Sequence, residues 1–68
     1  MRTKLDGKRL RYARDRLGCS LDMVRERSGI SKNTARRAER GEEVRPSTAR
    51  KIAAGLSVEV SDLIKEPE

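Results

Sequence analysis

Several kinds of residue are missing or nearly missing from this chain of 68 residues. It contains no histidine, tryptophan or phenylalanine, and Tyr12 and Cys19 are its single tyrosine and cysteine. One cysteine without histidine cannot supply the ligands of a zinc site, and it cannot form an internal disulfide bond. No phosphate-binding loop and no catalytic group of residues stands out. We therefore expect no metal, no cofactor, no catalytic residues and no enzymatic activity, with Cys19 as a small apolar residue of the core.

Long apolar stretches are also missing. No run approaches the ~20 residues that a membrane-spanning helix needs, and the chain does not open with the pattern of a signal peptide. Because 41% of the residues are charged, a large enclosed pocket for a small molecule is not expected. The length suits one small domain over residues 1–68. We predict a cytoplasmic, nucleoid-associated protein with no membrane contact and no small-molecule substrate.

The chain does contain an excess of basic residues, 17 Lys and Arg against 11 Asp and Glu. The excess is unevenly placed: residues 1–18 carry a net charge of +5, residues 19–41 of +3 and residues 42–68 of −2. This asymmetry favours a polyanionic partner, with DNA or RNA ahead of a membrane surface. A chain with one aromatic residue has no stacking platform for single strands, which argues against single-stranded RNA.

Helix start and stop signals recur along the chain, whereas no strand pattern is evident. The start signals are the capping residues Asp6, Ser20 and Ser31 and the dipeptide Pro46-Ser47, and the stop signals are Gly18, Gly29 and Gly41. Together with the apolar spacing, they predict helices at about 6–17, 20–28, 31–40, 47–56 and 60–65. Leu17 is expected on the buried face of the first helix, beside Leu10 and Ala13. The prediction is an all-α fold, one compact five-helix domain, with residues 65–68 as a tail or the start of a linker.

The helix predicted at 31–40 has two contrasting faces. At about 100° per residue, its cationic and amide side chains fall within a sector of roughly 140°. That sector holds Lys32, Asn33, Arg36, Arg37 and Arg40, and the opposite sector holds Thr34, Ala35 and Ala38. Arg and Lys can bond the major-groove edge of guanine, and Asn can bond that of adenine. The pattern favours contact with nucleic acid over an ordinary solvated surface.

The two short helices around Gly29 have the spacing of a helix-turn-helix unit, and here the chain resembles a known family. The segment "SLDMVRERSGISKNTARRAERG" is similar to the helix-turn-helix of the lambda-repressor and Cro family. The segment "RPSTARKIAAGLSVEVSDLI" is similar to the helices that follow it there. The resemblance covers residues 8–64. It implies a lambda-repressor-like fold. It also implies a protein that binds double-stranded DNA sequence-specifically, as a transcriptional repressor or phage-type regulator.

The resemblance also implies roles for individual residues. The helix at 31–40 would be the recognition helix, which enters the major groove. The positions that meet base edges are Lys32, Asn33, Arg36 and Arg37. The positions near phosphates are Ser20, Ser31, Arg40 and Arg45, of which the two serines are also expected to cap their helices. Arg14 and Glu39 match the positions of a structural ion pair between the first helix and the recognition helix.

Some positions depart from the pattern of that family. Arg25 stands where a small residue is usual. Ala35 and Ala38 are smaller than the usual Ile or Leu, and we interpret this loss of bulk as room made for Arg25. Gly55 stands in place of an alanine, and a glycine inside a helix costs about 0.5–1 kcal/mol relative to alanine. Ser57 stands in place of a glycine that ends a helix.

Two points of function stay open. The alternative to DNA binding is a protein-interaction module, an antitoxin or an adaptor whose helix-turn-helix face docks on an acidic partner. The second point is the oligomeric state, because members of the family mostly bind inverted repeats as dimers. A homodimer of this chain would need a contact through the last helices, where Val58, Val60 and Leu63 are candidates, or through residues beyond position 68.

Overall fold

A computed structural model describes residues 3–64 of the chain, which form five helices and two short strands. Their order is β1 (Thr3–Lys4), α1 (Gly7–Arg16), α2 (Leu21–Ser28), α3 (Lys32–Glu39), β2 (Glu43–Val44), α4 (Pro46–Gly55) and α5 (Val60–Leu63). The observed helices lie within two residues of the predicted ranges, and the predicted tail at 65–68 falls outside the described residues. The all-α five-helix fold is confirmed.

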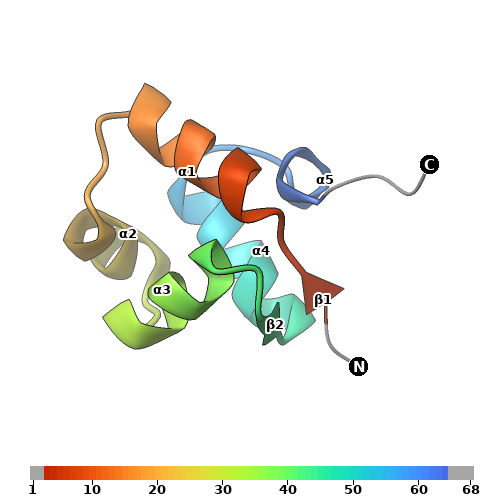
Figure 1. The fold of residues 1–68 in the computed structure, drawn as a ribbon. Helices are drawn as coiled ribbons and strands as arrows, with labels where there is room; N and C mark the ends of the chain where they lie inside the picture. Colours follow the sequence, from red (N-terminus) through yellow and green to blue (C-terminus); the bar gives the residue numbers. More distant parts are fainter. Residues whose placement is uncertain (1–2, 65–68) are drawn as a thin grey trace.

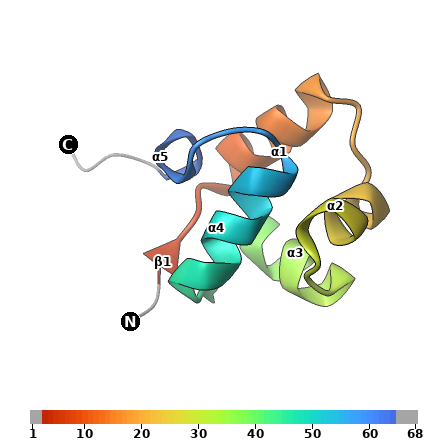
Figure 2. The same ribbon diagram turned by 180° about the vertical axis from the view of Figure 1, so that it is seen from behind.

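The five helices pack against one another around a shared core. Figures 1 and 2 show α2 and α3 next to each other on one side of the domain, with β1 and α5 on the opposite side. Helix α4 contacts both α2 and α5, and α1 contacts both α3 and α5. Helix α3 is therefore supported by α1, α2 and β2, which leaves its remaining face toward solvent.

The helix-turn-helix of α2 and α3 follows from local hydrogen bonds. The Ser20 hydroxyl accepts the backbone N–H of Met23 at 3.2 Å, and the Ser31 hydroxyl accepts that of Thr34 at 3.1 Å. Each serine thereby satisfies a backbone donor that has no partner inside the helix. Between them, Gly29 ends α2 with a φ of 72°, a conformation that glycine adopts without steric cost. These three small residues thus determine where α2 begins and ends and where α3 begins.

The prediction that the chain contains no strand is wrong. Thr3 pairs with Val44 and Lys4 with Glu43 in an antiparallel ladder, so the loop expected after α3 contains β2. Two-residue strands show no alternation of apolar and polar residues, and nothing local marks them. The pairing matters for burial, because Val44 and Leu5, the residue after β1, are both part of the core.

The core is built from the inner faces of all five helices, and Cys19 is buried in it as predicted. The prediction for Leu17 is wrong, since its side chain is 44% exposed. Leu17 is the C-cap of α1, which ends at Arg16, and its side chain lies at the edge of the core, where it lines an open hollow with Tyr12 and Val58. Within residues 3–64, no helix has the length and apolar character that crossing a membrane requires.

Candidate nucleic-acid interface

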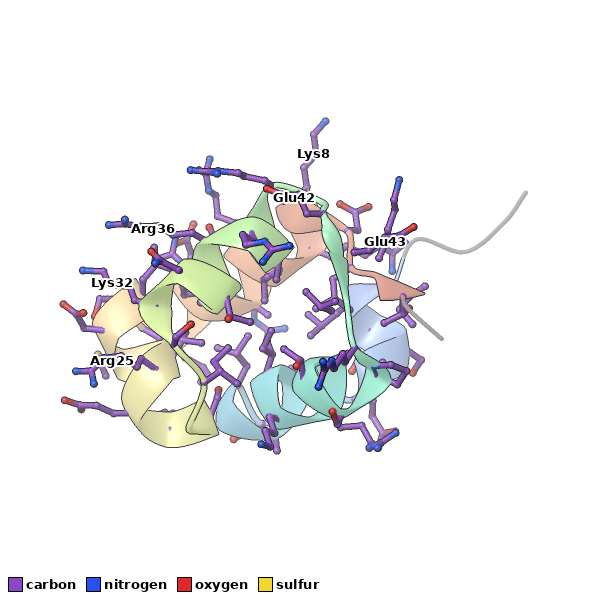
Figure 3. The ribbon with its side chains drawn as sticks, turned by 90° about the horizontal axis from the view of Figure 1, so that it is seen from below. Lys8, Arg25, Lys32, Arg36, Glu42 and Glu43 are labelled. Carbon is purple, nitrogen blue, oxygen red and sulfur yellow. The ribbon has the colours of Figure 1, made fainter. Side chains whose placement is uncertain are left out.

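Helix α3 has one buried face of small side chains and one exposed face of polar and cationic side chains. Ala35 is 2% exposed and Ala38 is fully buried. Asn33, Arg36, Arg37 and Arg40 are exposed and Lys32 is half-buried. Figure 3 shows Lys32 and Arg36 extending away from the body of the domain on the same side as Arg25 of α2. Because small side chains let α3 pack closely on its neighbours, its outer face forms a ridge.

The interpretation that Arg25 explains the small residues of α3 is wrong. Arg25 is exposed, and the small cavity beside Ala35 is lined by other residues. These are Leu10, Arg14, Leu21, Val24, Glu39 and Ile52, which come from α1, α2, α3 and α4. Side chains from α1, α2 and α4 therefore surround Ala35, and Arg25 is not among those that line this cavity.

Three cations of the ridge have acidic partners within the domain. Lys32 Nζ lies 3.1 Å from the Asp22 carboxylate of α2. Glu42, which follows α3, lies 3.3 Å from Arg37 Nε and 3.7 Å from Arg40 Nη1. All of these side chains are at least 40% exposed, so each pair contributes about 0–1 kcal/mol.

Asn33 and Arg36 differ from the other residues of the ridge. Within residues 3–64, neither side chain makes a hydrogen bond or an ion pair with another side chain. Both are exposed near the start and middle of α3. Their donors are therefore available to a ligand without loss of an internal contact.

A hollow of about 330 Å³ brings together two residues that sequence analysis placed in different roles. Arg37 of α3 and Arg45, the residue before α4, both line it, together with Thr34, Thr48 and the β2 residues Glu43 and Val44. Arg45 gives α4 no side-chain cap, so the N–H groups of the first turn of α4 have no such partner. Free N–H groups at a helix N-terminus favour an anion. The two threonines were not predicted, because a hydroxyl outside a cap position carries no distinctive pattern.

A second group of cations lies at the start of α1, next to the end of α3. A hollow of about 570 Å³ is lined by Lys4, Lys8, Arg11 and Arg40, and also by Glu39. In the sequence this charge is visible only as the net +5 of residues 1–18, because its position beside α3 depends on how α1 packs against α3. The basic surface of the domain thus extends from the ridge to α1.

Arg14 and Glu39 face each other between α1 and α3. Arg14 Nη2 donates to Glu39 Oε1 at 3.0 Å, and Arg14 Nη1 donates to the backbone oxygen of Cys19 at 3.0 Å. The side chains are 19% and 12% exposed. Arg11 Nε lies 3.6 Å from the same Glu39 oxygen but is largely exposed. The geometry gives Arg14 a structural role, because its guanidinium joins α3, α1 and the start of α2.

The order of elements, the small buried face of α3 and its supporting helices are those of a helix-turn-helix domain. A family model described as helix-turn-helix matches residues 10–63. The chain belongs to the Cro/CI-type helix-turn-helix family. The match to the family takes in α1 from Leu10 onward, α2, α3, β2, α4 and α5.

One relative of this helix-turn-helix family comes from Archaeoglobus fulgidus. It is named "Putative HTH-type transcriptional regulatory protein" and is 43% identical over 49 residues, which are 72% of this chain. The matched segment is 16% of the relative's length, so the chain corresponds to a small part of that protein. No solved structure matches the chain significantly.

Proposed function

We propose that this domain binds double-stranded DNA and inserts α3 into the major groove. The observation that carries the proposal is the contrast between the two faces of α3: Ala35 and Ala38 are buried, while Asn33 and Arg36 are exposed and, among residues 3–64, have no side-chain partner. A major groove admits an α-helix, and Arg and Asn are the residues that bond guanine and adenine there. A purely solvated surface does not require that combination.

Base and phosphate contacts divide between different parts of the surface in this proposal. Lys32, Asn33, Arg36 and Arg37 meet base edges, and Ser20, Ser31, Arg40 and Arg45 meet phosphates. Support for the phosphate role of Arg45 comes from its position before α4, whose first turn has no side-chain cap and offers N–H donors. Phosphate contacts hold the protein in register, and base contacts select the sequence.

The biological role proposed for the domain is regulation of transcription, as a repressor or a phage-type regulator. Support comes from the family and from the relative named as a transcriptional regulatory protein. A homodimer on an inverted repeat is part of the proposal. Val58 and Val60 are half-buried, whereas Leu63 is 1% exposed and belongs to the monomer core. Val58 and Val60 are therefore the better candidates for a dimer contact.

The test combines selection of duplexes from a random DNA pool with a salt titration. About six neutralised phosphates per bound unit would give a slope of log K against log salt near −5. Enrichment of one sequence together with such a slope supports the proposal. A slope near zero and no enrichment would contradict it and would favour the alternative of a domain that docks on an acidic protein.

A further inference from the structure

Glu42 is an acidic residue at the edge of an otherwise basic surface, and the backbone holds it over Arg37. Gly41 adopts a φ of 82°, and the N–H groups of Gly41 and Glu42 donate to the oxygens of Ala38 and Arg37 at 3.0 Å. This hydrogen-bonded ending reverses the chain after α3. As a result, the Glu42 carboxylate reaches back to α3, with Oε1 3.3 Å from Arg37 Nε and Oε2 3.7 Å from Arg40 Nη1.

The contact with Arg37 uses only one edge of its guanidinium. Arg37 Nε donates to Glu42, while the four N–H bonds on the two terminal nitrogens stay available. A bidentate contact with guanine needs two donors held in a plane. Arg37 is 55% exposed, so a carboxylate that fixes its orientation reduces the side-chain freedom lost on binding.

The same carboxylate weakens binding to DNA that has no matching base for Arg37. Its negative charge lies beside Arg37 and Arg40 and reduces the attraction of both arginines for the phosphate backbone. Repulsion between a carboxylate and phosphates weakens binding to every sequence, whereas the oriented Arg37 gains only on the sequence that it recognises. Selectivity arises when an unfavourable contact is offset only by the correct partner.

We infer that Glu42 is a positioning residue that determines specificity: it orients Arg37 toward one base pair and lowers the affinity for all other DNA. This inference rests on the proposed function, in which Arg37 meets a base edge. Figure 3 labels Glu42 at the turn after α3, together with Glu43, its neighbour in β2. Glu43 is exposed and makes no ion pair within the part of the chain that the structure describes. It is therefore a matched control for the charge of Glu42.

The experiment measures binding of five proteins to a duplex library in which every position of the selected site is varied. The proteins are the parent and the variants Glu42→Ala, Glu42→Gln, Glu43→Ala and Arg37→Ala, each first checked for an unchanged melting profile. Arg37→Ala identifies the base pair that Arg37 reads. Glu42→Gln removes the charge but keeps an oxygen that can accept the Arg37 Nε–H.

The expected result for Glu42→Ala is tighter binding to random duplexes and a loss of up to about fivefold in preference at the base pair identified by Arg37→Ala. Glu42→Gln should also bind random duplexes more tightly but lose less of the preference. Glu43→Ala should change random binding only. Full preference in Glu42→Ala, an equal loss in Glu43→Ala, or no base pair assigned to Arg37 would overturn the inference. A parent protein with no preferred sequence would instead contradict the proposed function itself.

Discussion

Gly55 of α4 lies so close to Ser28 of α2 that a Cβ atom on residue 55 would overlap the Ser28 hydroxyl oxygen. The same Cβ would lie 3.3 Å from the Ser28 backbone nitrogen. Gly55 therefore does more than weaken its helix. The missing side chain lets α2, the helix under α3, approach α4.

The first prediction is that Gly55→Ala destabilises the protein although alanine favours helices. The loss of stability from overpacking, about 1–3 kcal/mol, outweighs the gain in helix propensity from glycine to alanine, about 1 kcal/mol. In a Ser28→Ala background the overlapping oxygen is gone, and the Ser28 Oγ atom has no hydrogen-bond partner to lose within the described residues. A double-mutant cycle by urea denaturation should show coupling of about 0.5–3 kcal/mol. Strict additivity of the two changes would contradict the close contact.

Ser57→Gly should stabilise the domain by about 0.5–1 kcal/mol. Ser57 has a φ of 58°, in the left-handed region that costs residues other than glycine about 1–2 kcal/mol. It follows α4, where Ser57 N–H and Val58 N–H donate to Ala54 and Ala53, the arrangement that Gly41 completes after α3. Thermal melting measures the gain, with Ser57→Ala as the control that keeps a Cβ. Equal melting temperatures for the glycine and alanine variants would show that the backbone conformation is not strained.

Glu39→Ala should destabilise the domain by about 2–4 kcal/mol, somewhat below the cost of breaking a fully buried pair. The change leaves Arg14, at 19% exposure, without its carboxylate partner. Arg11→Ala is the matched control, because Arg11 contacts the same carboxylate from a side chain that is 71% exposed. Its effect should stay below about 1 kcal/mol. If chemical denaturation gives both variants the stability of the parent protein, the Arg14–Glu39 contact does not hold α1 and α3 together.

Arg37→Ala and Arg45→Ala should affect DNA binding in different ways. Arg45→Ala should weaken binding to all sequences and make the salt slope shallower by about one unit. Arg37→Ala should cost about 1–3 kcal/mol on the selected site and relax the preference at one base pair, with random DNA less affected. Competition binding against a fully varied site library separates the two. If both variants lost affinity equally for all sequences, α3 would contribute positive charge but would not recognise bases.

The sequence by itself determined the helices and the polarity of α3. Caps and left-handed glycines act through hydrogen bonds between residues a few positions apart, so Ser20, Gly29 and Ser31 mark the helix-turn-helix without knowledge of the fold. The angular spacing of Ala35 and Ala38 likewise identifies the buried face of α3 from local geometry. The Arg14–Glu39 contact was implied only by resemblance to a family, because no local rule pairs residues so far apart.

Only the tertiary structure decided which side chains meet across elements. The pairing of Thr3–Lys4 with Glu43–Val44 depends on the segment before α1 being brought beside the segment between α3 and α4, and two residues are too few to show a strand pattern. The contact between Gly55 and Ser28 depends on how closely α2 and α4 pack, which neither residue type reveals. Glu42 is near Arg37 in sequence, but only the reversal at Gly41 turns its carboxylate onto the arginine. Such contacts depend on the position of one element relative to another, and that position is set by packing of the whole core.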